Sequence, residues 1–386
     1  MSYPTPPSPA DLGVYVHIPF CLSKCSYCAF SSVQSERNLM SRYLDDVERE
    51  IDWHMQRGTC EGRRARSLYF GGGTPSLTPP ARLARLIARC RTAWGLAEDA
   101  EITLEVNPET ASLGAFRAWG EAGVNRISLG VQSLDSDELL DLRRPHTPRR
   151  VIEACEQARR ARCPNLSVDL IYGIPGQPSE RWRATVRGIL SLGPDHLSAY
   201  ALTPEPGTPF GAAVEEGRVL LPPDDLILEQ EQILEEEITA AGLRRYEISN
   251  YARPGYECRH NLLYWRGDDW LGLGASAHSR IGERRWWNRF DPTEYLDHSP
   301  EEWMAGEERL DARQRMGEAL AVGVRLIGGV DRHRITRLLG IDPWTSHRAA
   351  LNSLSRAGLL EPDLDVVRLT PQGLMFADHV GETLVS

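Results

Sequence analysis

Short apolar runs rich in β-branched residues alternate with helical patterns over the first half of this chain. No other feature of the sequence constrains the fold as strongly. The predicted strands lie at residues 14–17, 67–70, 102–106, 126–130, 166–171 and 196–201. The predicted helices between them lie near residues 36–56, 80–93, 111–122, 148–160 and 179–192. This βαβα order requires a parallel sheet covered by helices. Six units are too few to close an eight-stranded barrel, so we predict an open, partial (β/α)6 barrel of the TIM type.

The second half of the chain changes character twice. Residues 222–241 predict one acidic amphipathic helix, whose inner face holds Leu226, Ile233, Leu234 and Ile238. A loop-rich stretch dense in aromatic residues follows, and helical patterns then return at residues 314–326, 334–339 and 345–357, before a short strand at 366–369 and a last helix. We therefore predict an α/β protein with a C-terminal, mainly helical, winged-helix-like domain. Its segments are the barrel at 11–245, an aromatic-rich connection at 246–305 and the helical domain at 306–386.

Charge and hydropathy limit the possible partners and location. Lys and Arg total 44 against 54 Asp and Glu, which gives a net charge of −10, and Lys24 is the only lysine. No basic arm or stripe is present, which argues against nucleic acid as the main partner. No apolar run reaches about 18 residues, so we predict no membrane span, although peripheral contact with a membrane stays open. Residues 1–10 lack the features of a signal peptide, and we predict a cytoplasmic location.

Three of the eight cysteines, Cys21, Cys25 and Cys28, share one loop directly after the first predicted strand. Closely spaced cysteines in a reducing compartment are metal ligands more often than disulfides. Thiolates hold iron–sulfur clusters or zinc, and a [4Fe–4S] cluster normally takes four of them. Three thiolates leave one iron with an open position, where S-adenosylmethionine can bind and be cleaved to a radical. The loop therefore predicts a radical-SAM protein; a zinc site with His17 or a distant cysteine as fourth ligand is the alternative.

Unusual residues also gather at the predicted carboxyl ends of the strands, where β/α barrels carry their chemistry. The run GGGTP at residues 71–75 follows the second strand, and missing side chains let a backbone approach a ligand closely. Glu105, Gln132 and Asp169 lie at or near the ends of the next three strands. A carboxylate in an apolar strand is costly to bury without a partner. A local hydrogen bond explains each residue singly, but the set predicts a ligand site at this edge.

The motifs together resemble one family. YVHIPFC-x3-C-x-YC, GGGTP, GVQS and DLIYGIPGQ are similar to segments of the oxygen-independent coproporphyrinogen III dehydrogenase family, which includes the heme chaperone HemW, and the similarity covers nearly the whole chain. The resemblance implies contacts with S-adenosylmethionine at the matching positions, which are Tyr15, Tyr27, Gly72, Gly73, Thr74, Glu105, Gln132, Arg144, Asp169 and Ala201. It implies that residues 72–74 meet the amino-acid end of the cofactor, beside Glu105. Gln132, Arg144 and Asp169 then hold the ribose and carboxylate side, and Ala201 contacts the adenine region.

Three features indicate the heme-chaperone branch of that family. Phe30 stands where the dehydrogenase has an additional cysteine, and only 14 residues precede Tyr15, where the dehydrogenase has a long extension. The segment HNLLYW at 260–265 is similar to a motif of the chaperone branch. Its His260 is a candidate axial ligand for heme iron, and its aromatic residues are suited to covering a macrocycle. The alternative is that His260 fixes a loop and the aromatic residues belong to the core.

The leading hypothesis is a heme chaperone that binds heme and delivers it to heme-accepting apo-proteins. It would carry a [4Fe–4S] cluster and S-adenosylmethionine, with an electron donor as a further partner. The alternative is an enzyme, the oxygen-independent coproporphyrinogen III dehydrogenase, which removes two carboxyl groups by radical chemistry to give protoporphyrinogen IX. A radical reaction on another substrate is a third possibility. All three share one cofactor site, so the cysteine motif does not separate them.

Overall fold

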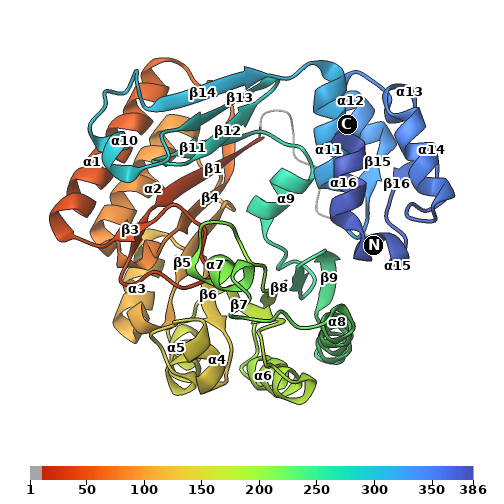
Figure 1. Ribbon diagram of the computed structural model, residues 1–386. Helices are drawn as coiled ribbons and strands as arrows, with labels where there is room; N and C mark the ends of the chain where they lie inside the picture. The colour runs from red at the N-terminus through yellow and green to blue at the C-terminus, as the bar shows by residue number, and fades with distance from the viewer. Residues whose placement is uncertain (1–10, 386) are drawn as a thin grey trace.

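A twelve-stranded sheet forms the centre of the computed structural model, which describes residues 11–385 (Figure 1). The strand order is β14-β13-β12-β11-β1-β4-β5-β6-β7-β8-β10-β9. Its six central strands are parallel to their neighbours and follow chain order; they are β1 (Asp11–Ile18), β4 (Arg64–Gly72), β5 (Glu101–Val106), β6 (Arg126–Gln132), β7 (Leu166–Tyr172) and β8 (His196–Ala201). The sheet stays open because β1 and β8 pair with further strands instead of with each other. The prediction of a partial barrel is confirmed; the prediction about a signal peptide at 1–10 lies outside the described residues.

Helices follow the central strands and cover the outer face of the sheet (Figure 1). They are α1 (Arg37–Gln56), α2 (Pro80–Trp94), α3 (Leu113–Ala122), α4 (Ser136–Asp141), α5 (Pro148–Arg160) and α6 (Ser179–Ser191). Local sequence sets several of their ends. Ser112 caps α3 by accepting a hydrogen bond from the amide of Ala115, and Thr147 caps α5 in front of Pro148. Gly95 ends α2 in the left-handed conformation that glycine adopts without strain.

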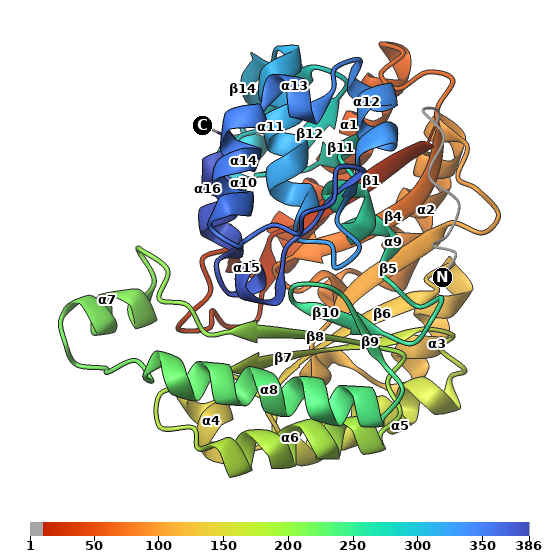
Figure 2. The same cartoon turned by 90° about the vertical axis from the view of Figure 1, so that its right-hand side faces the viewer.

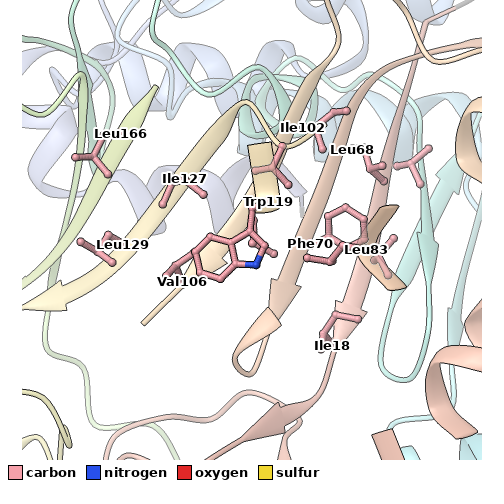
Figure 3. Packing of buried hydrophobic residues seen from close by; sticks show 14 of the residues in the cluster. Ile18, Leu68, Phe70, Leu83, Ile102, Val106, Trp119, Ile127, Leu129 and Leu166 are labelled. Atoms are coloured by element: carbon pink, nitrogen blue, oxygen red, sulfur yellow. The ribbon is translucent and has the colours of Figure 1, made fainter. Parts of the chain in front are cut away.

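The two faces of the central strands differ in chemistry. Leu68, Ile102 and Ile127 point toward the helices and pack around Trp119 of α3 (Figure 3). The residues between them, such as Tyr69 and Ser128, point into the barrel and line its cavity. In a closed β/α barrel, branched apolar side chains fill this interior. Here the interior is polar, which leaves room for a ligand.

The segment predicted as a loop-rich connection also contains short strands that the sequence analysis missed. β9 (Arg244–Glu247) and β10 (Asn250–Ala252) extend the sheet beyond β8, while β11 (Trp270–Leu273), β12 (His278–Ile281), β13 (Arg284–Asn288) and β14 (Met304–Arg309) extend it beyond β1. Two helices, α9 (Arg259–Trp265) and α10 (Pro292–Leu296), lie between these strands along the chain. The strands are short and contain charged residues, so they lack the apolar runs that reveal the central strands.

The main helices of the remaining segments lie where the sequence predicted them. The acidic helix α8 (Asp224–Ala240) lies along α6 (Figure 2) and buries Ile233, Leu234 and Ile238, while Leu226 is half-buried. The C-terminal elements have a hydrophobic core of their own. They are α11 (Ala312–Gly323), β15 (Val330–Asp331), α12 (Arg332–Leu339), α13 (Pro343–Ser346), α14 (Arg348–Arg356), β16 (Val366–Val367), α15 (Pro371–Met375) and α16 (Ala377–Val385). The pair β15–β16 is the ribbon that the prediction of a winged-helix-like domain requires.

The smaller elements lie near the cysteines. They are β2 (Phe20–Cys21), β3 (Val33–Gln34) and α7 (Pro209–Glu215). The backbone amide of Phe210 in α7 donates to the carbonyl of Ser26, so α7 contacts the cysteine loop directly. Within residues 11–385, no helix has the length and hydropathy needed to cross a bilayer.

A buried carboxylate joins α1 to the added strands. Glu50 accepts hydrogen bonds from the amide of Gly274 at 2.7 Å, the hydroxyl of Tyr295 at 2.8 Å and the side-chain amide of Asn288 at 2.6 Å. All three partners are donors, and burial raises the pKa of Glu50 to about 7. Both carboxylate oxygens are therefore needed as acceptors.

We expect Glu50→Gln to lower the free energy of unfolding by about 1–3 kcal/mol, because the new amide faces the donor of Asn288. The pKa of Glu50 in the folded protein lies above its value of about 4.3 in an unfolded chain. The contribution of Glu50 to the free energy of unfolding is therefore complete below about pH 4 and is lost as the pH rises through about 7. The difference between wild type and variant should thus narrow over that range in chemical denaturation. Glu121→Gln, on an exposed position of α3, is the control; equal effects at both sites would contradict the assignment.

Candidate functional site

A cavity of about 650 Å³ opens at the carboxyl ends of the central strands. Its volume lies in the range typical of small-molecule and cofactor sites. Every residue predicted to bind the cluster or S-adenosylmethionine lines this cavity except Tyr15, and the heme candidate His260 does not line it. The lining residues among those predicted are Cys21, Cys25, Tyr27, Cys28, Gly72, Gly73, Thr74, Glu105, Gln132, Arg144, Asp169 and Ala201. The structure thus brings together residues from six strands and the loops that follow them.

The cysteine loop packs directly on the glycine run after β4. The amides of Gly73 and Thr74 donate to the carbonyls of Ile18 and Phe20, at 2.9 and 2.7 Å. A Cβ atom on Gly73 would lie 2.8 Å from the carbonyl oxygen of Phe20 and 3.0 Å from the sulfur of Cys21. Only glycine fits at position 73, because a side chain would push the two loops apart.

The three thiols line the same cavity from one loop of eight residues. Burial raises the pKa of Cys21 and of Cys28. Among residues 11–385, no three His, Cys, Asp or Glu side chains are grouped closely enough to share a single metal ion. A [4Fe–4S] cluster is bound differently, because each thiolate attaches to its own iron. A soft, three-thiolate donor set on one loop therefore fits such a cluster.

His17, the alternative zinc ligand, lies among other partners. Its Nδ1 is 3.1 Å from the hydroxyl of Tyr15, and its Nε2 is 3.0 Å from the carbonyl oxygen of Ser31. Burial lowers the pKa of His17, so its ring is neutral at ordinary pH. Nε2 thus contacts the backbone after the cysteine loop and Nδ1 contacts a tyrosine hydroxyl, so both ring nitrogens have partners other than the thiols.

Glu105 holds the turn after β4. Its carboxylate accepts hydrogen bonds from the hydroxyl of Tyr69 at 2.9 Å and from the amide of Gly72 at 3.1 Å. Gly72 has a φ of 119°, a conformation open to glycine but strained for other residues. Burial raises the pKa of Glu105 to about 7, although both hydrogen bonds oppose that rise. A cationic group bound beside Glu105 would favour the ionised form of this carboxylate, so Glu105 is a suitable partner for a cation.

Arg144 connects the cysteine loop to the strand ends. Its guanidinium donates to the side chain of Asn107 at 2.7 Å, to the carbonyl of Gly130 at 2.9 Å and to the sulfur of Cys25 at 3.4 Å. Asn107 in turn donates to the hydroxyl of Thr74 at 3.0 Å. One cation therefore fixes the positions of loops that follow β1, β4 and β5.

Gln132 and Asp169 complete the far side of the cavity. Gln132 has a φ of 67° and follows a shift in the register between β6 and β7. A positive φ is uncommon for a residue other than glycine and often marks a functional site. Asp169 accepts a hydrogen bond from Ser128 at 3.1 Å, and burial raises its pKa.

Tyr15 lies behind the cavity wall and does not line it. Its ring stacks on that of Tyr69 with centroids 6.1 Å apart, and burial raises its pKa well above the usual value. The contact between Tyr15 and S-adenosylmethionine therefore stays a prediction.

The structure does not bring His260 to the site. His260 is 1 % exposed, and its ring nitrogens lie 2.8 Å from the hydroxyls of Ser67 and Tyr264. Burial lowers the pKa of His260 to about 3, and neither nitrogen is free for heme iron. The carboxylate of Glu101 accepts the amide of His260 at 3.1 Å and so anchors α9 at the start of β5. In this motif it is the neighbouring Asn261 that lines the cavity.

Comparisons with known proteins agree with this geometry. A model of the Radical SAM superfamily matches residues 15–189, and a model of the HemN C-terminal domain matches residues 310–376. Heme chaperone HemW of Mycobacterium tuberculosis is 36 % identical over 387 residues, which cover 99 % of this chain and 96 % of that protein. This chain belongs to the HemW family. Heme chaperone HemW of Bacillus subtilis is 32 % identical over 95 % of this chain and 97 % of that protein.

The solved structure of coproporphyrinogen III oxidase (HemN) from Escherichia coli has the same fold. Its TM-score is 0.82 at 24 % identity, over 97 % of this chain and 90 % of that one. Radical SAM proteins hold a [4Fe–4S] cluster and S-adenosylmethionine, so membership of the HemW family implies both cofactors. Cys21, Cys25 and Cys28 would hold the cluster, which would supply an electron for the reductive cleavage of S-adenosylmethionine.

We expect Cys25→Ser to remove most of the iron and the visible absorbance of the reconstituted cluster, because a hydroxyl is a poor ligand for it. Cys163→Ser, at a half-buried cysteine remote from the loop, should leave both unchanged. Iron and sulfide content per chain is the measurement. Full cluster loading of Cys25→Ser would contradict the assignment of the loop.

We expect Arg144→Met to weaken binding of S-adenosylmethionine about tenfold or more, because the variant loses hydrogen bonds that position three loops and a charge facing the cavity. Calorimetric titration of the cluster-loaded protein measures this. Arg143→Met is the matched control, since Arg143 is exposed and does not line the cavity. Equal losses in both variants would show that the loop, and not the guanidinium of Arg144, is responsible.

Proposed function

We propose that this protein is a heme chaperone, which binds heme and passes it to acceptor proteins while holding a [4Fe–4S] cluster and S-adenosylmethionine. One observation carries the proposal: the chain matches proteins named heme chaperone HemW over almost its whole length, at 36 % identity over 99 % of the chain. In the proposed site, Cys21, Cys25 and Cys28 hold the cluster, and residues around Glu105, Gln132, Arg144 and Asp169 hold S-adenosylmethionine. The cofactors serve the regulation or the release of heme.

The mouth of the cavity supports a flat, apolar cargo. Phe30 is 66 % exposed and Tyr200 is 46 % exposed, and both line the opening. Large exposed rings at the rim of a cavity commonly mark a binding surface, and aromatic faces pack well on a macrocycle. Lys24, exposed on the same rim, offers a cation for a propionate group of heme.

Phe30 also separates this proposal from the dehydrogenase. A cysteine at this position was expected for that enzyme from the family resemblance, and a phenylalanine supplies neither a thiol nor a proton. We therefore propose that the cavity receives heme at its rim and does not decarboxylate coproporphyrinogen III.

The test uses the anaerobically reconstituted protein with its cluster intact. Titration with heme should give a saturable change in the Soret absorbance, and addition of an apo-globin should transfer the heme. Incubation with S-adenosylmethionine, a reductant and coproporphyrinogen III should give no decarboxylated product. Absence of heme binding would overturn the proposal, and product formed over many turnovers would replace it with the dehydrogenase.

We expect Phe30→Ser to weaken heme binding about tenfold, because it removes an apolar contact of roughly 50 Å² or more at the rim. Phe376→Ser is the control, since Phe376 is also exposed but belongs to the C-terminal elements. Dissociation constants from the Soret titration decide the outcome. An unchanged affinity in Phe30→Ser would place heme elsewhere on the protein.

A further inference from the structure

A buried arginine whose Nε has no hydrogen-bond partner among residues 11–385 lies deep in the barrel. Arg126 begins β6, is 2 % exposed and lines the cavity below the predicted cofactor contacts. Its Nε has no hydrogen-bond partner, and within the described residues its guanidinium takes part in no ion pair. A buried cation normally has a direct partner, because removing it from water is costly. Arg126 therefore requires an explanation.

The groups around Arg126 are mainly acidic. Glu101 and Glu105 lie on β5 and Asp169 lies on β7, all facing the same interior. The charge of Arg126 lowers the pKa of Glu105 and of Asp169, against the rise that burial causes in both. Charges act over several ångströms in such an interior because little water screens them. The guanidinium thus influences both carboxylates without touching either.

The charge balance favours a cation over a second anion as the missing partner. Three carboxylates (Glu101, Glu105 and Asp169) and two guanidinium groups (Arg126 and Arg144) face this part of the barrel, so the carboxylates outnumber the cations. A further anion beside Arg126 would meet a negative field. A cation bound above the two carboxylates would complete the balance instead, and S-adenosylmethionine carries a sulfonium and an amino group.

We propose that Arg126 is a positioning residue for S-adenosylmethionine: its buried guanidinium lines the same cavity as Glu105 and Asp169 and supports the negative charge with which these two carboxylates hold the cationic cofactor. The proposal rests on the cofactor site proposed above and is independent of heme. It assigns a role to a residue that touches neither the cysteine loop nor the glycine run.

The other groups facing these carboxylates do not change charge near neutral pH. They are Tyr15, Tyr69, Tyr200, Arg144, Ser128 and Ser198. Loss of water around the hydroxyl group raises the pKa of each of these tyrosines, including Tyr200, whose side chain is otherwise partly exposed, so all three keep their protons. Burial also lowers the pKa of the two histidines that feel the charge of Arg126, His196 and His260, so both stay neutral. The pH dependence then comes from Glu105 and Asp169.

The experiment measures the dissociation constant of S-adenosylmethionine on the cluster-loaded protein, from about pH 6 to about pH 9. We compare wild type with Arg126→Met and Arg126→Lys. Without the cation, the carboxylates ionise at higher pH. Arg126→Met should therefore bind S-adenosylmethionine about tenfold more weakly than wild type near pH 7, but only about threefold more weakly or less near pH 9. The midpoint of the rise in affinity with pH should lie about one pH unit higher in the variant than in wild type. Arg126→Lys should restore the wild-type profile. The groups of S-adenosylmethionine that titrate over this pH range affect wild type and variants equally, so their effect cancels when the dissociation constants are compared.

Two outcomes would overturn the proposal: a profile of Arg126→Met that matches wild type, or a loss of affinity that is equal at every pH.

The double variant Arg126→Met/Glu105→Gln covers the case in which the single variant does not hold its cluster. This double variant removes one charge of each sign, so it should fold, load its cluster and bind with a weaker pH dependence. Failure of the double variant to load would assign Arg126 to the fold alone. Arg280→Met, at a buried arginine paired with Glu318 outside the cavity, is the control.

Discussion

The parallel pairing of β1 with β4 is the constraint on which the site depends. In this register His17 lies beside Gly71 and Ile18 beside Gly72, so the two strands end side by side. The hydrogen bonds from Gly73 and Thr74 continue the contact beyond the strands and into the loops. The cysteine loop and the glycine run therefore meet, although more than 40 residues separate them along the chain. A shift of one residue in this register would separate them and turn the polar side chains toward the helices.

The same alternation of side chains that builds the core also creates the cavity. One face of each central strand supplies the apolar contacts beneath the helices, as around Trp119. The other face carries hydroxyls, carboxylates and a guanidinium into the barrel. Burying these groups costs free energy, which hydrogen bonds such as those to Glu105 offset only in part. A ligand of complementary charge offsets the remainder, so stability and binding are coupled in this fold.

The sequence predicted the central part of the molecule well because its signals are local and strong. Buried parallel strands are continuous apolar runs, and residues at their carboxyl ends share one edge by topology. The strands at 244–309 were missed because they are short and charged, so only tertiary pairing reveals them. The sequence left two roles open for His260, because a motif does not tell which side chain faces a cavity: His260 turns toward Ser67, as the alternative of a structural histidine requires, whereas Asn261 lines the site. Arg126 was missed because an arginine at the start of a strand usually faces solvent.

Lys24 has a consequence for the chemistry of the whole chain. It is the only lysine among 386 residues, and it stands exposed on the rim of the cavity between Cys21 and Cys25. Reagents selective for primary amines can therefore acylate one side chain of this protein, besides its amino terminus. A fluorophore attached in this way reports on the cofactor loop without any engineered cysteine. Acylation would also erase the positive charge nearest to Cys28 on that loop, so a single covalent event changes the electrostatics of the mouth.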